Sequence, residues 1–208
     1  MIKIFVLISC ILFSCCNSCS VSKETESTLV TVSSTTDTIH IDNYELSPLG
    51  YACYQGDLKK VKHLISQGVN RKECMTDNVF VFDAIFASVY FNKPVLVDYF
   101  LELGDSVNSI YDDAGTTLLV VACKNSSTLI ATKLVENGAN VNGALLFIEN
   151  QYYPLIEAVN NNNTAIVKLL IEHGANIDVT DSEGYSPFSI ATSYNNEEML
   201  GILERGKY

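Results

Sequence analysis

Apolar residues after position 45 recur in one pattern, at a spacing of 33 to 36 residues. Each copy opens with a six-residue phrase, and a stripe of apolar residues at i, i+3 and i+4 follows it, which is typical of an amphipathic helix. The phrases occupy residues 47–52, 83–88, 117–122, 153–158 and 186–191. In the first four copies a glycine stands sixteen residues after the phrase ends, at Gly68, Gly104, Gly138 and Gly174. Each copy is therefore predicted to hold two helices.

Residues at the predicted helix ends support this assignment. Ser47 and Ser186 each precede a proline, and a hydroxyl before a proline favours a helix start because it can accept hydrogen bonds from free N–H groups. The four glycines supply the left-handed residue that ends a second helix. Polar caps of the second helices are predicted at Asp57, Asn163 and Asn195, and Pro94 suits the first turn of another.

This pattern resembles the ankyrin repeat, with its T-P-L-H-x-A phrase and its L-L-x-x-G-A ending. The best matches are 138–142 and 174–178, while no copy keeps the histidine of the phrase and the second lacks Thr-Pro. The resemblance implies an all-α solenoid of about five helix–turn–helix units with short connecting fingers. The units are 43–78, 79–112, 113–148, 149–181 and 182–208. The polar last unit has two interpretations, a terminal cap or a degenerate repeat.

The N-terminal residues predict export. An apolar run from Ile4 to Phe13 is too short to span a bilayer and suits a signal-peptide core. The run ends in Leu12-Phe13-Ser14-Cys15, which resembles the lipobox of bacterial lipoproteins. This resemblance implies a signal peptide over 1–14 and acylation of Cys15, with the chain held at a bacterial cell envelope. An ordinary secretory signal is the alternative.

Residues 15–42 are rich in serine and threonine and predict a flexible linker. In the alternative interpretation, Val30, Val32, Ile39 and Ile41 form a short strand or an arm against the first unit. The ankyrin-repeat domain is predicted to begin at residue 43.

The net charge and the absence of known catalytic motifs reduce the number of function classes that fit this sequence. The formal net charge is −11 and basic residues are scattered, so nucleic-acid binding is disfavoured and membrane attachment rests on the acyl anchor alone. The three histidines fall in different elements, and no metal or phosphate motif is present. We therefore expect no enzyme activity and no cofactor.

Three cysteines lie within the predicted repeats. Cys53 and Cys123 follow the closing alanine of their phrases and are expected to be buried, two units apart and thus too distant for a disulfide. Cys74 lies in a predicted turn and is the best candidate for a reactive thiol, although partial burial is favoured over such a function.

The ankyrin resemblance implies binding of a protein partner through the first helices and the fingers. Most residues at the implied contact positions are aromatic, which is typical of protein interfaces. The predicted contacts are Tyr54, Gln55, Phe82, Tyr90, Phe91, Lys124, Asn125, Tyr152, Asn160, Tyr185 and Tyr194, and Tyr44 and Phe80 also stand at implied contact positions. For Phe80, Phe82 and Phe91, core packing is an equal alternative.

The apolar finger over 143–152 either packs on its neighbour or offers Leu146 and Phe147 to a partner. We expect a monomer that binds a protein of the envelope. The alternatives are an immunity or protective factor for an envelope toxin or enzyme, a structural spacer, and an unrecognised enzyme.

Overall fold

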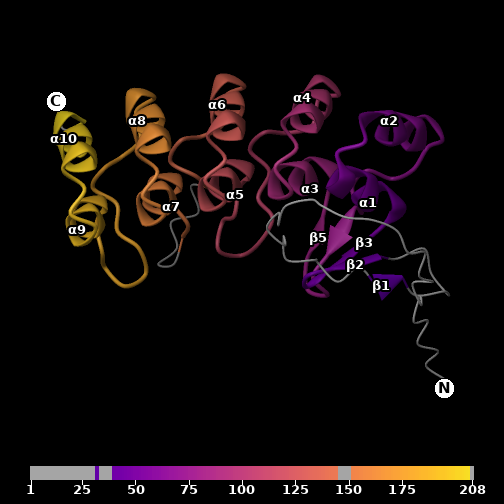
Figure 1. The fold of residues 1–208 in the computed structure, drawn as a ribbon, viewed down its shortest axis with the longest axis horizontal. Helices are drawn as coiled ribbons and strands as arrows, with labels where there is room; N and C mark the ends of the chain where they lie inside the picture. The colour runs from indigo at the N-terminus through magenta and orange to yellow at the C-terminus, as the bar shows by residue number, and fades with distance from the viewer. Residues whose placement is uncertain (1–30, 33–38, 145–150, 207–208) are drawn as a thin grey trace, which may run out of the picture.

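The computed structural model describes residues 31–32, 39–144 and 151–206. The predicted signal peptide, Cys15, Leu146 and Phe147 lie outside these residues. In the described part, ten helices form five pairs, and Figure 1 shows the pairs side by side with the first and second helices in two rows. The first helices are α1 (Pro48–Gln55), α3 (Ala84–Tyr90), α5 (Leu118–Lys124), α7 (Pro154–Asn160) and α9 (Pro187–Ser193). The second helices are α2 (Leu58–Ser66), α4 (Pro94–Glu102), α6 (Thr128–Glu136), α8 (Thr164–Glu172) and α10 (Glu197–Arg205).

The helix ends follow the predicted chemistry with one correction. Ser47 and Ser186 accept from the backbone N–H groups of Gly50 and Ser189, each at 3.2 Å. The glycines after the second helices have φ between 82° and 85°, the left-handed region in which they meet no Cβ strain. The predicted cap Asn195 is wrong, because Asn195 takes φ 52° in the turn and its neighbour Asn196 caps α10.

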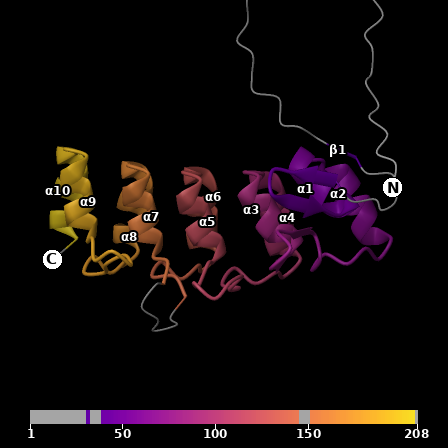
Figure 2. The same ribbon diagram turned by 90° about the horizontal axis from the view of Figure 1, so that it is seen from below.

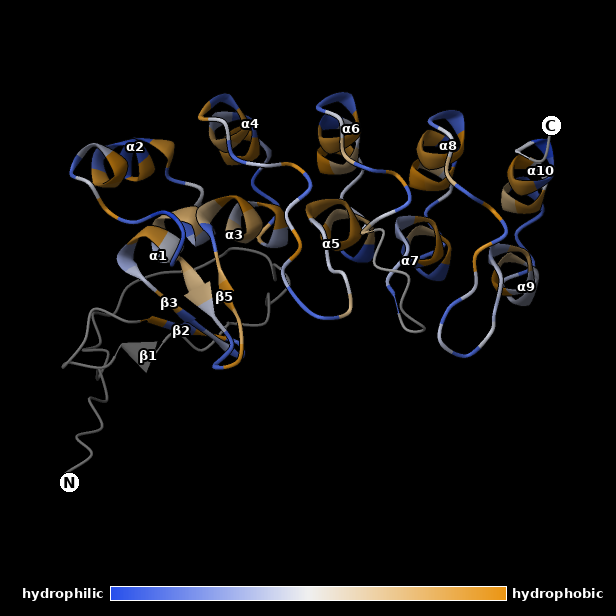
Figure 3. Cartoon of the chain, turned by 180° about the vertical axis from the view of Figure 1, so that it is seen from behind, coloured by the Kyte–Doolittle hydropathy of each residue, from blue (hydrophilic) through white to orange (hydrophobic). Residues whose placement is uncertain are grey.

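The apolar stripes of the second helices form a column through the stack. Val61, Val97, Ala131 and Val167 occupy equivalent places and are fully buried. Figure 3 shows apolar surfaces facing the neighbouring elements and polar surfaces at the outer ends of the second helices. In α10 the exposed Glu204 replaces the apolar residue of earlier units, which agrees with a terminal cap that shows a polar face to water.

A small antiparallel sheet extends the N-terminal end of the stack, below α1 and α3 (Figure 1). Its strands run in the order β1 (Thr31–Val32), β2 (Ile39–Ile41), β3 (Tyr44–Leu46), β4 (Met75–Thr76) and β5 (Val81–Phe82). Ile39 pairs with Leu46, and Leu46 pairs with Met75 on its other side.

The predicted linker over 15–42 is therefore too long at its C-terminal end. The folded part includes Ile39–Ile41, because Ile41 is buried in the core and its strand covers the free edge of β3. The alternative interpretation is confirmed for Ile39 and Ile41 in β2 and for Val32 in β1, while Val30 lies outside the described residues.

Figure 2 shows that the described parts of the loops joining successive units lie on one side of the stack. No helix within the described residues is long and apolar enough to cross a membrane. We call the surface formed by the first helices and the described parts of these loops the inner face.

Candidate protein-interaction surface

Every predicted contact residue belongs to a first helix or to the segment beside one. On α1, α3, α5 and α7 lie Tyr54, Gln55, Tyr90, Lys124 and Asn160. Directly after a first helix lie Phe91, Asn125 and Tyr194, and before one lie Phe82, Tyr152 and Tyr185. The inner face therefore brings the predicted positions onto one side of the stack, although their side chains differ in exposure.

At the N-terminal end, aromatic rings pack on one another. Phe82 stacks on Phe86 with ring centroids 4.3 Å apart, and Tyr111 lies 4.6 Å from Phe86. Tyr44 meets Tyr90 edge-on at 5.0 Å. We call Tyr44, Tyr54, Phe82, Phe86, Tyr90, Phe91 and Tyr111 the aromatic cluster.

The aromatic cluster corrects one predicted contact. Phe82 is only 5% exposed, because β5 directs its ring under α3 onto Phe86. Tyr54 and Phe91 are half-buried and meet edge-on at 5.1 Å. Edge-to-face and offset-stacked rings at these separations favour the folded chain. Much of the aromatic content at the predicted positions thus stabilises the first two units.

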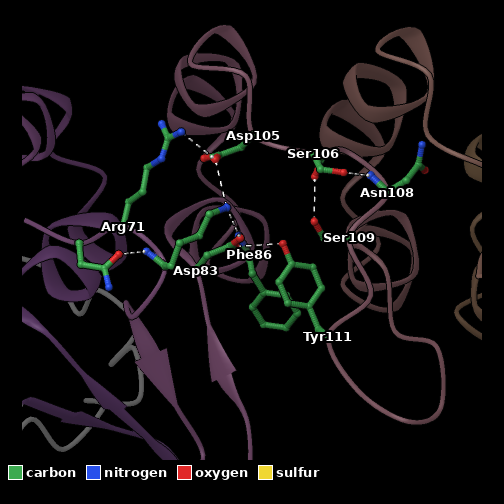
Figure 4. Close-up of polar contacts among 10 residues, drawn as sticks. Arg71, Asp83, Phe86, Asp105, Ser106, Asn108, Ser109 and Tyr111 are labelled. Carbon is green, nitrogen blue, oxygen red and sulfur yellow. Dashed lines mark hydrogen bonds and ion pairs between the residues drawn. The ribbon is translucent and has the colours of Figure 1, made fainter.

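Beside the aromatic cluster, two covered carboxylates meet basic partners from the first unit, as Figure 4 shows. Asp105 accepts from Arg71 at 3.2 Å and lies 3.3 Å from the Nζ of Lys72, which also reaches Asp83 at 3.4 Å. Asp83 further accepts from the Phe86 backbone N–H at 3.0 Å, which caps α3, and from the Tyr111 hydroxyl at 2.9 Å. Burial, followed by the charge of Asp83, raises the pKa of Tyr111. These bonds join the first two units.

Polar contacts dominate the inner face further along the stack. The Asn125 amide donates to the Tyr90 carbonyl at 3.0 Å, and the Tyr194 hydroxyl donates to the Asn160 carbonyl at 2.8 Å. Each bond joins the C-terminal end of one first helix to the next unit. Since Gln55, Asn125, Asn160, Tyr185 and Tyr194 are all exposed, these residues remain open to a partner.

Lys124 and Tyr152 form a cation–π pair between the third and fourth units. The Nζ of Lys124 lies 3.2 Å from the centroid of the Tyr152 ring, and a ring face attracts a cation in this geometry. Both side chains are half-buried.

Beside this pair lies a hollow of about 180 Å³ on the inner face. Its walls combine aromatic rings with carboxylates, and we call it the acidic hollow. It is lined by Gln151, Tyr152, Tyr153, Ile156, Glu157, Asn160, Asp181, Ser182 and Glu183. Burial raises the pKa of Glu157, the charge of Lys124 opposes this shift, and the charge of Asp181 adds a smaller rise. The residues that line the hollow include three carboxylates, those of Glu157, Asp181 and Glu183, and no lysine or arginine.

A family model for ankyrin repeats (3 copies) matches residues 49–144 and 143–207. The chain belongs to the ankyrin-repeat family. The predicted fold, an all-α ankyrin-repeat solenoid, is thereby confirmed. Ankyrin repeats generally mediate protein–protein interaction and are generally non-catalytic. No curated protein matches this chain.

The repeat alignment shows how unusual Glu157 is. It stands at the fifth place of its phrase, where the other four ankyrin units carry Tyr51, Ala87, Val121 and Ile190. Three of those residues are buried and Tyr51 packs against the core, so this place normally supports stacking. The ankyrin fold does not require a carboxylate there.

Two of the predicted contacts, Tyr152 and Asn160, line the acidic hollow, but its three carboxylates were not predicted. Glu157 breaks the apolar pattern of its phrase position, and this signal was present in the sequence. Asp181 and Glu183 stand in the finger just before Tyr185. Their convergence with α7 depends on how the finger folds, which spacing alone does not reveal.

The cysteines and histidines of the ankyrin domain add no catalytic set. Cys74 is 1% exposed, which confirms burial, the favoured interpretation, over a role as a reactive thiol. The ring Nδ1 of His173 lies 2.8 Å from the Leu169 carbonyl at the end of α8. Among the described residues, no three His, Cys, Asp or Glu side chains gather in a way that could hold a metal ion.

Proposed function

We propose that this ankyrin-repeat domain captures a protein partner on its inner face and seats a basic side chain of that partner in the acidic hollow. Glu157 carries the proposal. It places a carboxylate at a stacking position, in a hollow where burial and Asp181 raise its pKa. A carboxylate whose pKa is perturbed in this way, in a cleft and without a structural need, is typical of a binding site.

The walls of the acidic hollow suit a lysine or arginine side chain. Tyr152, Tyr153 and Ile156 can pack against the aliphatic stem, and the carboxylates can accept from the cationic head. The exposed Tyr185 and Tyr194 lie on the same face and can anchor the surrounding surface of the partner. The net charge of −11 would also speed the approach of a basic protein.

We further propose that acylated Cys15 tethers the domain to a bacterial cell envelope. Leu12-Phe13-Ser14-Cys15 supports this, and the segment that follows would keep the inner face near the membrane. The partner is then a protein of that compartment. Wild-type protein and a Cys15→Ala variant, expressed in bacteria with radiolabelled palmitate, test the anchor, since a wild-type chain without label would rule it out.

Crosslinking in intact cells tests the surface. A photoreactive phenylalanine analogue at Tyr185 or Tyr194 should give a discrete adduct with a partner after illumination. The same analogue at Val95 or Leu129, which are 60% and 59% exposed on second helices, should give none. Adducts from the second helices alone would move the binding surface away from the inner face.

Charge neutralisation tests the acidic hollow. A Glu157→Gln, Asp181→Asn variant should lose at least tenfold in affinity for the crosslinked partner, because two acceptors of a charge-assisted contact are removed. A matched Glu102→Gln, Glu136→Gln variant changes two exposed carboxylates at the ends of α4 and α6 and should bind as the wild type does. An equal loss of affinity in both variants would show that the net charge of the domain, and not the acidic hollow, determines binding.

A further inference from the structure

Two cysteines of the first unit lie against each other in the core. Cys53 is on α1 and Cys74 comes just before β4, and the two are 0% and 1% exposed. The backbone of Cys74 is held on both sides. Its N–H donates to the Phe82 carbonyl at 2.9 Å, and its carbonyl accepts from the Ser47 N–H at 3.1 Å and the Ser47 hydroxyl at 3.2 Å.

The close packing of α1 against the segment at Cys74 brings the two thiols together. Gly50 touches the backbone at Cys74 so closely that a Cβ on Gly50 would collide with the Cys74 carbonyl oxygen. Cys53 stands three residues after Gly50 and therefore lies on the same side of the helix. The two thiols hydrogen-bond to each other, and this contact, followed by burial, raises the pKa of Cys74.

We propose that Cys53 and Cys74 are a disulfide-forming pair that closes when the chain folds in an oxidising compartment. With a small-molecule disulfide such as oxidised glutathione as the oxidant, one cysteine thiolate attacks it and releases one glutathione thiol. The second cysteine then attacks the mixed disulfide, which forms the Cys53–Cys74 bond and releases the second glutathione. The two cysteines lose two electrons and two protons, and the oxidant gains them.

The burial of Cys74 determines at which stage of folding the disulfide can form. In the folded chain the raised pKa keeps Cys74 protonated, and a thiol is a poor nucleophile in exchange. The exchange therefore takes place while the first unit is still open, and folding then encloses the bond.

The first unit is where such a bond has most effect. It would close the loop from residue 53 to residue 74, which contains α2, and in α2 Val61 is the one fully buried residue. The helix also carries the exposed Lys59 and Lys60 on its first turn. A cross-link stabilises such an end unit by restricting its unfolded state. The proposal does not depend on partner binding, since the acidic hollow is formed by α7 and the loops before α7 and α9.

Peptide mapping tests the pair directly. The full chain is unfolded, reduced, refolded with glutathione and oxidised glutathione, and then denatured in the presence of iodoacetamide so that buried free thiols can react. Trypsin with an aspartate-directed protease then places Cys53, Cys74 and Cys123 on separate peptides. We expect a Cys53–Cys74 linked peptide and alkylated Cys123, which is buried but has no thiol partner among the described residues.

The melting temperature gives a second readout. The oxidised chain should melt about 5–10 °C above the same chain in dithiothreitol. A Cys123→Ala variant should keep this difference, and a Cys74→Ser variant should lose it. Alkylated Cys53 and Cys74 in a natively folded oxidised sample, or a bond from Cys74 to a cysteine of the first twenty residues, would overturn the proposal.

Discussion

Covered carboxylates in the first two units of this ankyrin stack are paired with basic side chains, whereas those in the last two units are not. At the N-terminal end, Asp83 and Asp105 meet Arg71, Lys72 and the Tyr111 hydroxyl. Toward the C-terminal end, Glu157 and Asp181 line a hollow whose lining includes no lysine or arginine, and the nearby Lys124 only opposes the rise in the pKa of Glu157. Paired acids in the first region hold units together, whereas acids in excess in the second region are available to a ligand.

Aromatic side chains also differ between the two regions, because they pack on one another at the N-terminal end and are more exposed at the C-terminal end. At the N-terminal end the rings of the aromatic cluster contact one another, and Phe82 and Phe86 are buried. At the C-terminal end Tyr185 and Tyr194 are about half exposed, at 52% and 47%. An aromatic residue at a family contact position is therefore not evidence of binding until its burial is known.

The largest expected effect is a loss of stability on truncating the aromatic cluster. Phe86→Ala removes a ring that is 3% exposed and should cost about 3–5 kcal/mol of unfolding free energy, because it leaves a cavity among Phe82, Tyr90 and Tyr111. Phe188→Ala, on α9, should cost about 1 kcal/mol, because that ring is only half-buried. Urea unfolding followed by circular dichroism measures both, and equal costs would contradict the contrast between the regions.

Two helical glycines offer a matched comparison of packing at the ends of the stack. Gly50→Ala should destabilise by about 1–3 kcal/mol, since the new Cβ collides with the backbone at Cys74. Gly201→Ala should stabilise by about 0.5–1 kcal/mol, because its Cβ would meet only the end of the Arg205 side chain, at 3.7 Å, and alanine favours a helix. Thermal melts of the two variants should shift in opposite directions. A gain in stability for Gly50→Ala would mean that α1 is free to move away from Cys74.

Local chemistry made the helical part of this ankyrin chain predictable. Gly68, Gly104, Gly138 and Gly174 end helices because a left-handed residue is needed there, and the stripes before them mark the buried sides. The error at Asn195 has the same origin. Either of two adjacent asparagines can cap a helix, and only the turn geometry, with Asn195 at φ 52°, assigns the role to Asn196.

Features that depend on distant pairing were not predictable from spacing. The sheet joins β3 to β4 across about thirty residues, and the short runs at Ile39 and Tyr44 carry little signal alone. The ion pairs of Asp105 with Arg71 and Lys72 likewise cross from one unit to the next. Only part of the acidic hollow was predicted. Tyr152 and Asn160 stand at contact positions, but its carboxylates, which come from α7 and the finger before α9, were not predicted.

The smallest expected effect gives the sharpest test of the excess charge at the C-terminal end. The pKa of Glu157 is raised above its ordinary value, so the folded chain binds this proton more tightly than the unfolded chain does. The stability that comes from protonated Glu157 is fully present below the unfolded pKa and is lost as the pH rises through the raised folded pKa. At pH 7, above the unfolded pKa, ionisation of Glu157 is therefore less favourable in the folded chain than in the unfolded chain, and Glu157→Gln removes this cost.

Glu157→Gln should thus raise the melting temperature at pH 7 by about 1–2 °C, a modest gain because the side chain is partly screened by water. The gain should vanish near pH 4, where wild-type Glu157 is protonated, and Glu136→Gln at an exposed position should show no such pH dependence. Differential scanning fluorimetry between pH 4 and pH 8 measures both variants. A loss of stability at pH 7 would mean that Glu157 serves the fold. A gain there, together with weaker partner binding, is the pattern of a residue kept for binding at the expense of stability.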